Sequence, residues 1–463
     1  MNKEALRKKI TGDPAAGTAG LQDDWWTAIS PVLWKSRGSY LRDLSGEEYL
    51  DMCGFFGTSP IRFDHPVLRD REVLNKMGRI AMIRPSLSDF WTAELAEFVD
   101  TFRKNAVPPY MHHLFFIDGG ALAVENALKA AFDWKVRLNI QKGKITDDPR
   151  EDLRPLGTSV VGFEMAFHGR SGYTLSLTHT NDPRKYMFFP KLGWHRFNPP
   201  VMQFDENGHI CNTGDIKKVH EKCLAEIEAL FDRKADDIAA VIIEPIQCEG
   251  GDRHIPVDFF VALRKITRAY DVLLIYDEVQ TGFGTTGKMW AHEHFGETAR
   301  PDLIAFAKKA QVGGIMANYD IFARIDGHVF STTDTGKNRL NSTWGGHPAD
   351  MMRCTLLLEI IKKEKLVENA SRIGQYLLSG IRDLCRQYPA VITNARGCGM
   401  LISFDTVQMP LRSALWKACL KENLLCLTCG AQSIRFRPHL DLSRLDADQA
   451  LNRLEKALKS INI

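Results

Sequence analysis

The sequence predicts an α/β protein with a large, mainly parallel sheet domain and a smaller α+β domain. Two observations indicate this. Between about residues 110 and 310, short apolar runs alternate with segments of helical length, as in a parallel sheet covered on both faces. The chain also has 463 residues, which is too many for one ordinary core.

The large domain is expected to span residues 81–350. A helix is predicted after the first apolar run, because Val124, Leu128 and Phe132 recur at helical spacing. Amphipathic segments before two later runs predict further helices. The predicted strands are 114–117, 159–164, 238–244, 272–278 and 302–309.

The smaller domain is expected from residues 351–463, where a long helical segment leads into short strands and a final helix. Residues 1–80 are rich in Trp, Phe, Gly and Pro and carry only short strand patterns. We expect this N-terminal segment to complete the smaller domain.

Composition excludes several classes of function. Net charge is only +3, with acids and bases interspersed, which gives no basis for a nucleic-acid surface. No apolar run reaches the roughly 18 residues that span a bilayer. The basic start, MNKEALRKKI, lacks the apolar stretch of a secretory signal, so a cytoplasmic protein is expected. A lone CxxC, Cys426 to Cys429, indicates buried reduced thiols rather than a metal site.

Ligands of open parallel sheets bind at the carboxyl ends of the strands. After the first predicted strand, a glycine turn containing Gly120 and Ala121 opens a helix. Free amides at a helix N-terminus bind phosphate well, although a plain strand–helix turn has the same pattern. After the second strand come Phe167 and Arg170. They could stack on a flat ring and bind a carboxylate, or be a core Phe and a solvated Arg.

The later strands end in charged residues. Asp277 follows an apolar run, and a buried carboxylate requires a cationic or proton-donating partner. Glu244 and Glu249 follow another strand. Lys308 and Lys309 stand at the end of the last one, where burial would lower an amine pKa and make the lysine nucleophilic.

Together these residues suit one cofactor. Pyridoxal 5′-phosphate has a phosphate, a flat ring, a pyridine nitrogen that must stay protonated and an aldehyde that reacts with lysine. A carboxylate such as Asp277 beside the pyridine nitrogen would keep it charged.

A family resemblance is carried by motifs that run in order over most of the chain. The sequence resembles the class III (ω-amino) aminotransferases, of pyridoxal-phosphate transferase fold type I. Within them it is most similar to the lysine ε-aminotransferases, because of its HGRSGYTLSLT stretch and its double lysine. The motifs are GGALAVENALKAAFDWK, FHGRSGYTLSLT, EPIQCEGG, YDEVQTGFGTTGK, PDLIAFAKK, NSTWGG and IRFRP.

The resemblance implies roles for the cofactor-binding residues. Lys308 matches the lysine that bonds to the cofactor aldehyde, with Lys309 as the competing candidate. Asp277 matches the acid on the pyridine nitrogen. The remaining matches are Phe167 stacked on the ring, Gln280 near the phenolic oxygen and substrate, Gly120 and Ala121 at the phosphate, and Thr343 reaching the phosphate across a homodimer interface.

It also implies how substrate is bound. Arg435 matches the residue that binds the α-carboxylate of 2-oxoglutarate, and Glu249 the acid that covers Arg435 when lysine is bound. Arg170 would take the distant carboxylate. The implied reaction converts L-lysine and 2-oxoglutarate to 2-aminoadipate 6-semialdehyde and L-glutamate.

Three alternatives remain open. The nearest is another ω-aminotransferase, acting on ornithine, 4-aminobutyrate or a diamine. An aminomutase of the same fold would not need 2-oxoglutarate. A non-catalytic relative serving as a scaffold is disfavoured by the intact Lys308, Asp277 and phosphate loop.

Overall fold

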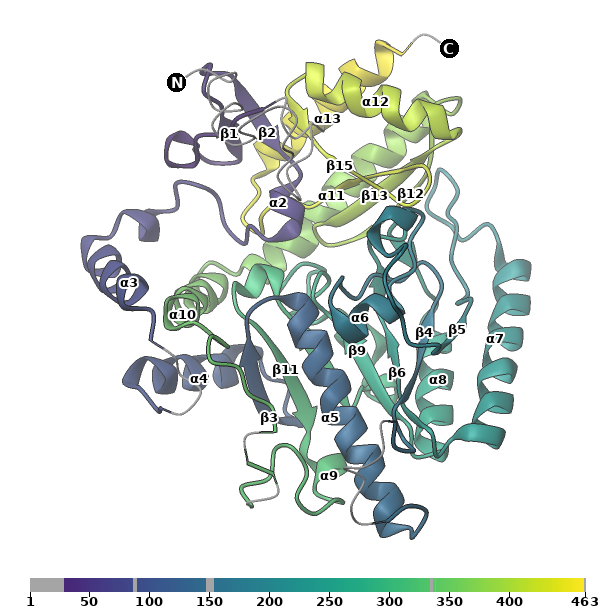
Figure 1. The fold of residues 1–463 in the computed structure, drawn as a ribbon. Helices are drawn as coiled ribbons and strands as arrows, with labels where there is room; N and C mark the ends of the chain where they lie inside the picture. Colours follow the sequence, from purple (N-terminus) through teal and green to yellow (C-terminus); the bar gives the residue numbers. More distant parts are fainter. Residues whose placement is uncertain (1–28, 86–89, 147–153, 334–335, 338, 462–463) are drawn as a thin grey trace.

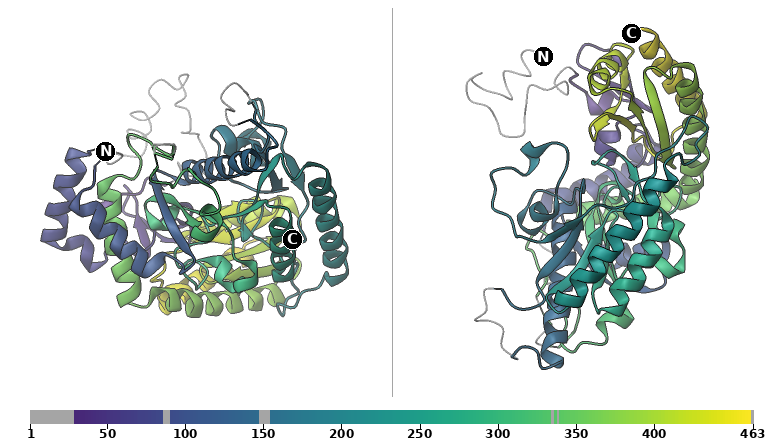
Figure 2. Two further views of the ribbon diagram at one scale, coloured as in Figure 1. Left: turned by 90° about the horizontal axis from the view of Figure 1, so that it is seen from below. Right: turned by 90° about the vertical axis from the view of Figure 1, so that its right-hand side faces the viewer.

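The computed structural model describes residues 29–85, 90–146, 154–333, 336–337 and 339–461. These form two parts, one stacked on the other, as the right-hand view of Figure 2 shows. The larger part is built on one seven-stranded sheet. The smaller part holds the C-terminal helices and small sheets (Figure 1). The N-terminal decapeptide and residues 11–28 lie outside the described residues.

The large sheet has the order β3-β11-β10-β9-β6-β4-β5. Only β11 runs antiparallel to its neighbours, while β10, β9, β6, β4 and β5 are parallel. The predicted mainly parallel sheet is thus confirmed. Its strands are β3 (Met111–Ile117), β4 (Ser159–Phe163), β5 (His195–Phe197), β6 (Ile238–Ile243), β9 (Leu273–Asp277), β10 (Leu303–Phe306) and β11 (Gly313–Asn318).

Both faces of this sheet are buried. In β9, Leu273 and Ile275 pack in the cluster under α5, while Leu274 and Tyr276 pack on the opposite side with α7 and α8. Successive side chains of a strand point to opposite faces, so Leu273 to Tyr276 are apolar without alternation. The covering helices are α5 (Gly120–Gln141), which crosses the front of the sheet in Figure 1, α7 (Thr213–Lys234) and α8 (Val257–Ala269).

The smaller part contains a four-stranded antiparallel sheet of order β12-β13-β16-β15. A second sheet joins the two ends of the chain, because β14 pairs in parallel with β2. The strands are β1 (Tyr40–Arg42), β2 (Glu48–Asp51), β12 (Ile392–Cys398), β13 (Leu401–Thr406), β14 (Leu424–Leu425), β15 (Leu427–Cys429) and β16 (Ser433–Phe436).

The amphipathic helix α11 (Leu366–Gln387) connects the parts, since its apolar face lies in one cluster with residues of β10, β11 and the small sheets.

No helix within the described ranges is long and apolar enough to cross a membrane. The remaining elements are α2 (Gly54–Gly57), α3 (Arg71–Ile83), α4 (Ala93–Ala106), α6 (Gly172–Leu177), α9 (Tyr319–Phe322), α10 (Pro348–Lys363), α11 (Leu366–Gln387), α12 (Met409–Lys421), α13 (Arg444–Lys459) and the short hairpin β7 (Ile246–Gln247) with β8 (Arg253–His254).

A buried ion pair ties α8 to the sheet. Arg264 Nη1 lies 2.6 Å from Asp302 Oδ2, and both side chains are almost fully buried. Removing one partner of such a pair leaves an uncompensated charge, so Arg264→Leu is expected to lower the free energy of unfolding by about 3–5 kcal/mol. Urea denaturation measures this. Arg268→Leu, on the exposed side of the same helix, is the control, and an equal loss in both variants would contradict the assignment.

Candidate active site

The start of α5 lies at the carboxyl edge of the sheet. Its N-cap, Gly119, has a φ of 85° and makes no side-chain capping bond, so the first helical amides remain open to an anion. A Cβ on Gly120 would come within 2.6 Å of Val279 Cγ1, and one on Gly169 within 2.7 Å of Ala121 Cβ. The loops after β9 and β4 therefore pack directly against this helix start, and glycine permits the close approach.

Asp277, the last residue of β9, is buried and paired. Its Oδ2 lies 2.7 Å from His168 Nδ1, and its Oδ1 accepts a hydrogen bond of 3.0 Å from the amide of Val279. Burial alone would lower the pKa of His168, but the hydrogen bond and charge of Asp277 outweigh it and raise that pKa. The pair places a carboxylate, backed by an imidazole, at the strand end.

Glu244 follows β6 and organises two neighbouring loops. Its carboxylate accepts the amide of Phe167 at 2.9 Å and the amide of Cys248 at 3.2 Å. Burial raises the pKa of Glu244 to about 7. This acid thereby fixes the backbone of the aromatic residue that follows β4.

The ring of Phe167 is half-buried and carries two cations near it. The Arg170 guanidinium lies 6.0 Å from the ring centroid, and the Lys185 ammonium lies 5.8 Å from it. Arg170 itself is exposed. The Phe167 ring and the cationic side chains of Arg170 and Lys185 are therefore neighbours.

Glu249 bridges two cations. Its Oε2 lies 2.7 Å from Arg435 Nη2, and its Oε1 pairs with Lys185 Nζ. Arg435 also donates to the carbonyl of Cys248 at 2.9 Å. Burial would raise the pKa of Glu249, but Arg435 and Lys185 hold it below its usual value, so this carboxylate is charged.

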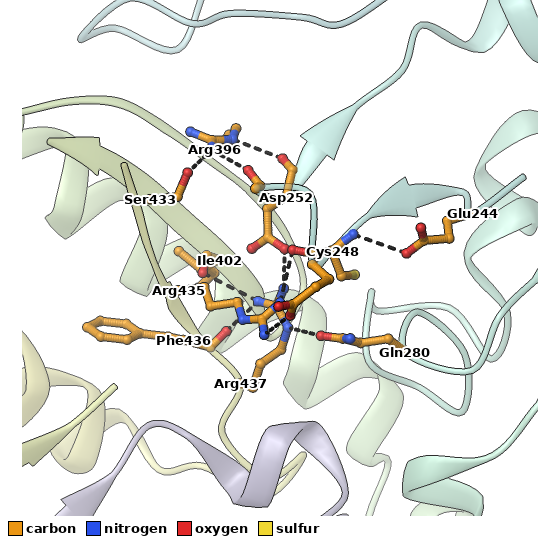
Figure 3. A network of polar contacts seen from close by, with 12 residues as sticks. Glu244, Cys248, Asp252, Gln280, Arg396, Ile402, Ser433, Arg435, Phe436 and Arg437 are labelled. Atoms are coloured by element: carbon orange, nitrogen blue, oxygen red, sulfur yellow. Dashed lines mark hydrogen bonds and ion pairs between the residues drawn. The ribbon is translucent and has the colours of Figure 1, made fainter. Parts of the chain in front are cut away.

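A second buried arginine joins the two parts of the molecule (Figure 3). Arg437 donates from Nε to Gln280 Oε1 at 3.1 Å and forms an ion pair with Asp252. Its side chain and that of Asp252 are fully buried. Gln280, three residues after Asp277, is therefore oriented by a residue from the segment following β16.

Lys308 lies beyond the end of β10, which stops at Phe306. A left-handed φ of 51° at Lys308 reverses the chain there. The predicted strand 302–309 is therefore shorter than expected, because a single 3₁₀ turn over Lys308–Ala310 replaces its end. Burial lowers the pKa of Lys308 to about 8.

Lys309 points elsewhere. Its Nζ donates to the carbonyls of Ser59 and Pro438, both at 3.2 Å, and of Gly57 at 3.4 Å. Burial lowers its pKa to about 7. These contacts occupy its amine with the backbone of the smaller part, which favours Lys308 as the reactive lysine.

Thr343 lies in an exposed loop that packs beside the end of β3. A Cβ on Gly345 of this loop would lie 3.0 Å from Ile117 Cδ1. Thr343 is exposed and lies two residues before Gly345. Its loop is therefore near the end of β3, the strand that leads into the glycine turn.

Four residues of the site had no assigned role in the sequence interpretation: His168, Glu244, Lys185 and Arg437. Two had a usable signal, because His168 is next to Phe167 and Glu244 ends an apolar strand as Asp277 does. Arg437 lies in the IRFRP motif, two residues after Arg435, whereas Lys185 lies in a segment without such a pattern.

Comparison with known proteins decides the family. The model of the aminotransferase class-III family matches residues 23–458. The chain belongs to this family. It is an enzyme of the class III aminotransferases, and the resemblance seen in its motifs is confirmed.

Three similar sequences illustrate the match. The L-lysine-epsilon aminotransferase of Mycobacterium tuberculosis is 41% identical, covering 92% of this chain and 91% of that protein. That of Streptomyces clavuligerus is 37% identical over 92% and 90%. The human mitochondrial 4-aminobutyrate aminotransferase is 32% identical over 88% and 80%.

Solved structures agree. The lysine aminotransferase from M. tuberculosis superposes with a TM-score of 0.89 at 39% identity, covering 99% of both chains. An amine transaminase from an uncultivated Pseudomonas species, at 22% identity and a TM-score of 0.79, shares the fold. The fold is that of pyridoxal-phosphate transferases of type I.

The cofactor of this family is pyridoxal 5′-phosphate, and the residues present fit it. The uncapped start of α5 suits a phosphate. The half-buried ring of Phe167 suits a flat heterocycle. Asp277 supplies a buried carboxylate for a pyridinium, and Lys308 an amine whose pKa is lowered to about 8.

The pH dependence of cofactor capture tests Lys308. Only a neutral amine attacks an aldehyde. The rate constant for cofactor binding to apoenzyme should therefore rise with pH through a midpoint near 8, instead of near 10.5 as for an exposed lysine. Stopped-flow absorbance measures it. Lys309→Met is expected to keep a midpoint near 8, and a wild-type midpoint near 10 would refute the assignment.

Proposed function

We propose that this enzyme transfers the ε-amino group of L-lysine to 2-oxoglutarate, giving 2-aminoadipate 6-semialdehyde and L-glutamate. The similarity to L-lysine-epsilon aminotransferases over 92% of the chain supports the substrate. The observation that carries the proposal is the Glu249–Arg435 ion pair at 2.7 Å, because it lets one site accept two differently shaped substrates.

The cofactor, when bound, draws electrons from the substrate carbon that carries the amine. Lys308 is assigned the covalent attachment of the cofactor and, once released, the transfer of a proton at the reacting carbon. With a pKa of about 8, roughly a tenth of the amine is neutral at pH 7, far more than for an exposed lysine with a pKa near 10.5, and a general base must be neutral to accept a proton.

The remaining cofactor contacts are assigned by position. Asp277 would hold a proton on the pyridine nitrogen, with His168 as its hydrogen-bond partner. Phe167 would stack on the ring, and Gln280, held by Arg437, would contact the phenolic oxygen and the substrate. Gly120 and Ala121 provide backbone amides for the phosphate, since no side chain caps that helix start.

Substrate choice depends on two arginines and one acid. Lysine that reacts through its ε-amine brings no carboxylate near the reacting carbon, so Glu249 remains on Arg435 and spares it a buried unpaired charge. The carboxylate of lysine reaches Arg170. With 2-oxoglutarate, the α-carboxylate takes the place of Glu249 on Arg435 and the distal carboxylate binds Arg170.

We further propose a cytoplasmic homodimer in which Thr343 reaches the phosphate of the partner site. Its exposed loop beside the end of β3 supports this. The proposed domain division is a large domain of residues 81–350 and a small one formed by 1–80 and 351–463. The pairing of β2 with β14 supports joining these last two segments.

A second candidate is transamination of 4-aminobutyrate, ornithine or a diamine. The 32% identity to the human 4-aminobutyrate aminotransferase favours keeping this alternative. It shares every residue role above and differs only in the amine donor.

Product identification tests the donor. With 2-oxoglutarate as acceptor, lysine should exceed ornithine and 4-aminobutyrate in kcat/KM by at least about tenfold. NMR spectroscopy should find the cyclised semialdehyde, which forms only if the ε-amine reacts, and separate it from the cyclic imine of equal mass that forms if the α-amine reacts. Lys308→Ala is the control and should lower kcat by about 10³-fold or more. Faster turnover of ornithine than of lysine would refute the proposal.

Subunit mixing tests Thr343. Thr343→Glu should repel the phosphate and inactivate the enzyme, as Lys308→Ala does. If Thr343 acts across the interface, every mixed dimer carries one intact site. Because about half of the dimers formed from equal amounts of the two variants are mixed, refolding them together should restore about a quarter of the wild-type activity. If Thr343 acts within its own subunit, each site of a mixed dimer keeps one lesion and no activity returns.

A further inference from the structure

Lys185 provides Glu249 with a second counter-charge besides Arg435. The two oxygens of Glu249 are divided between them, Oε2 on Arg435 and Oε1 on Lys185. The Lys185 and Glu249 side chains are only 17% and 19% exposed, so water screens the pair weakly. Neither the motifs nor the proposed reaction assigns Lys185 a task.

The backbone around Lys185 is held by local hydrogen bonds. Lys185 ends a short 3₁₀ turn, Pro183–Lys185, that Asp182 caps by accepting the amide of Arg184. Its ammonium also lies 5.8 Å from the Phe167 ring centroid, which adds a cation–π contact. The side chain is therefore held at the site from two directions.

We propose that Lys185 is a positioning residue for Glu249 that favours binding of the 2-oxo dicarboxylate over binding of the amine donor. The inference rests on the proposed function, in which Glu249 leaves Arg435 when a carboxylate binds there. On leaving, Glu249 keeps Lys185 as its partner. Without Lys185, the displaced carboxylate would lie partly buried and unpaired.

The energetic asymmetry follows from counting partners. With the amine donor bound, Glu249 has two cations and loses one if Lys185 is removed. With the dicarboxylate bound, Glu249 has only Lys185 and loses its sole partner. Leaving a buried charge without any partner costs far more free energy than removing one of its two partners. Removal of Lys185 should therefore penalise the dicarboxylate complex selectively.

A direct contact between Lys185 and substrate is the competing explanation. Arg170 and Lys185 both lie near the Phe167 ring, so both could hold one distal carboxylate. In that case removal of Lys185 would weaken lysine as well, because Arg170 is the residue assigned to the lysine carboxylate. The two explanations therefore differ in the lysine half-reaction.

The experiment compares holoenzyme with Lys185→Met and Lys185→Arg. Single-turnover absorbance gives the two half-reactions separately, with lysine and with 2-oxoglutarate. Isothermal titration calorimetry with glutarate, a dicarboxylate without a reacting group, gives binding alone. Arg184→Met is the matched control, since it removes the adjacent charge, which pairs with Asp182.

For Lys185→Met we expect the apparent Kd for 2-oxoglutarate and the Kd for glutarate to rise at least about tenfold. The lysine half-reaction should stay within about twofold, and Lys185→Arg should restore most of the dicarboxylate binding. Unchanged dicarboxylate binding, or an equal loss for lysine, would overturn the proposal. If wild-type enzyme does not react with lysine, the proposed donor fails, while glutarate binding still tests Lys185.

Discussion

The site depends on a negative charge kept at the end of a buried strand. Asp277 ends a strand whose apolar side chains are buried on both faces of the sheet, and its own side chain is therefore buried as well. Such a carboxylate persists only with partners, and His168 and the Val279 amide supply them. The loops after β4 and β9 are thereby fastened together, and the start of α5 packs against both.

The second half of the site comes from the smaller part of the molecule. Arg435 and Arg437, on and just after β16, reach Glu249, Gln280 and Asp252 on loops of the large part. Lys309 adds contacts in the other direction, from the large part to backbone carbonyls around Ser59 and Pro438. In the proposed function, substrate is therefore recognised between the two parts, by ion pairs that two alternative ligands would rearrange.

Local patterns were enough to predict much of this arrangement. A wholly apolar run ending in an acid identifies a strand end, and a glycine turn into a helix identifies an anion site, because both are properties of consecutive residues. Partners were not predictable in this way. His168 lies 109 residues from Asp277, Lys185 lies 64 residues from Glu249, and Arg437 lies 157 residues from Gln280.

By itself, the sequence determined the family, the cofactor and the order of the strand ends, because motifs and hydrophobic periodicity are encoded locally. Only the tertiary structure decided which charges meet and which lysine is engaged elsewhere. Lys308 and Lys309 are adjacent and chemically identical, yet the backbone turns at Lys308, where φ is left-handed. The amine of Lys309 donates to three backbone carbonyls. Burial and partner geometry are properties of the folded chain, and they set the charge state of each group.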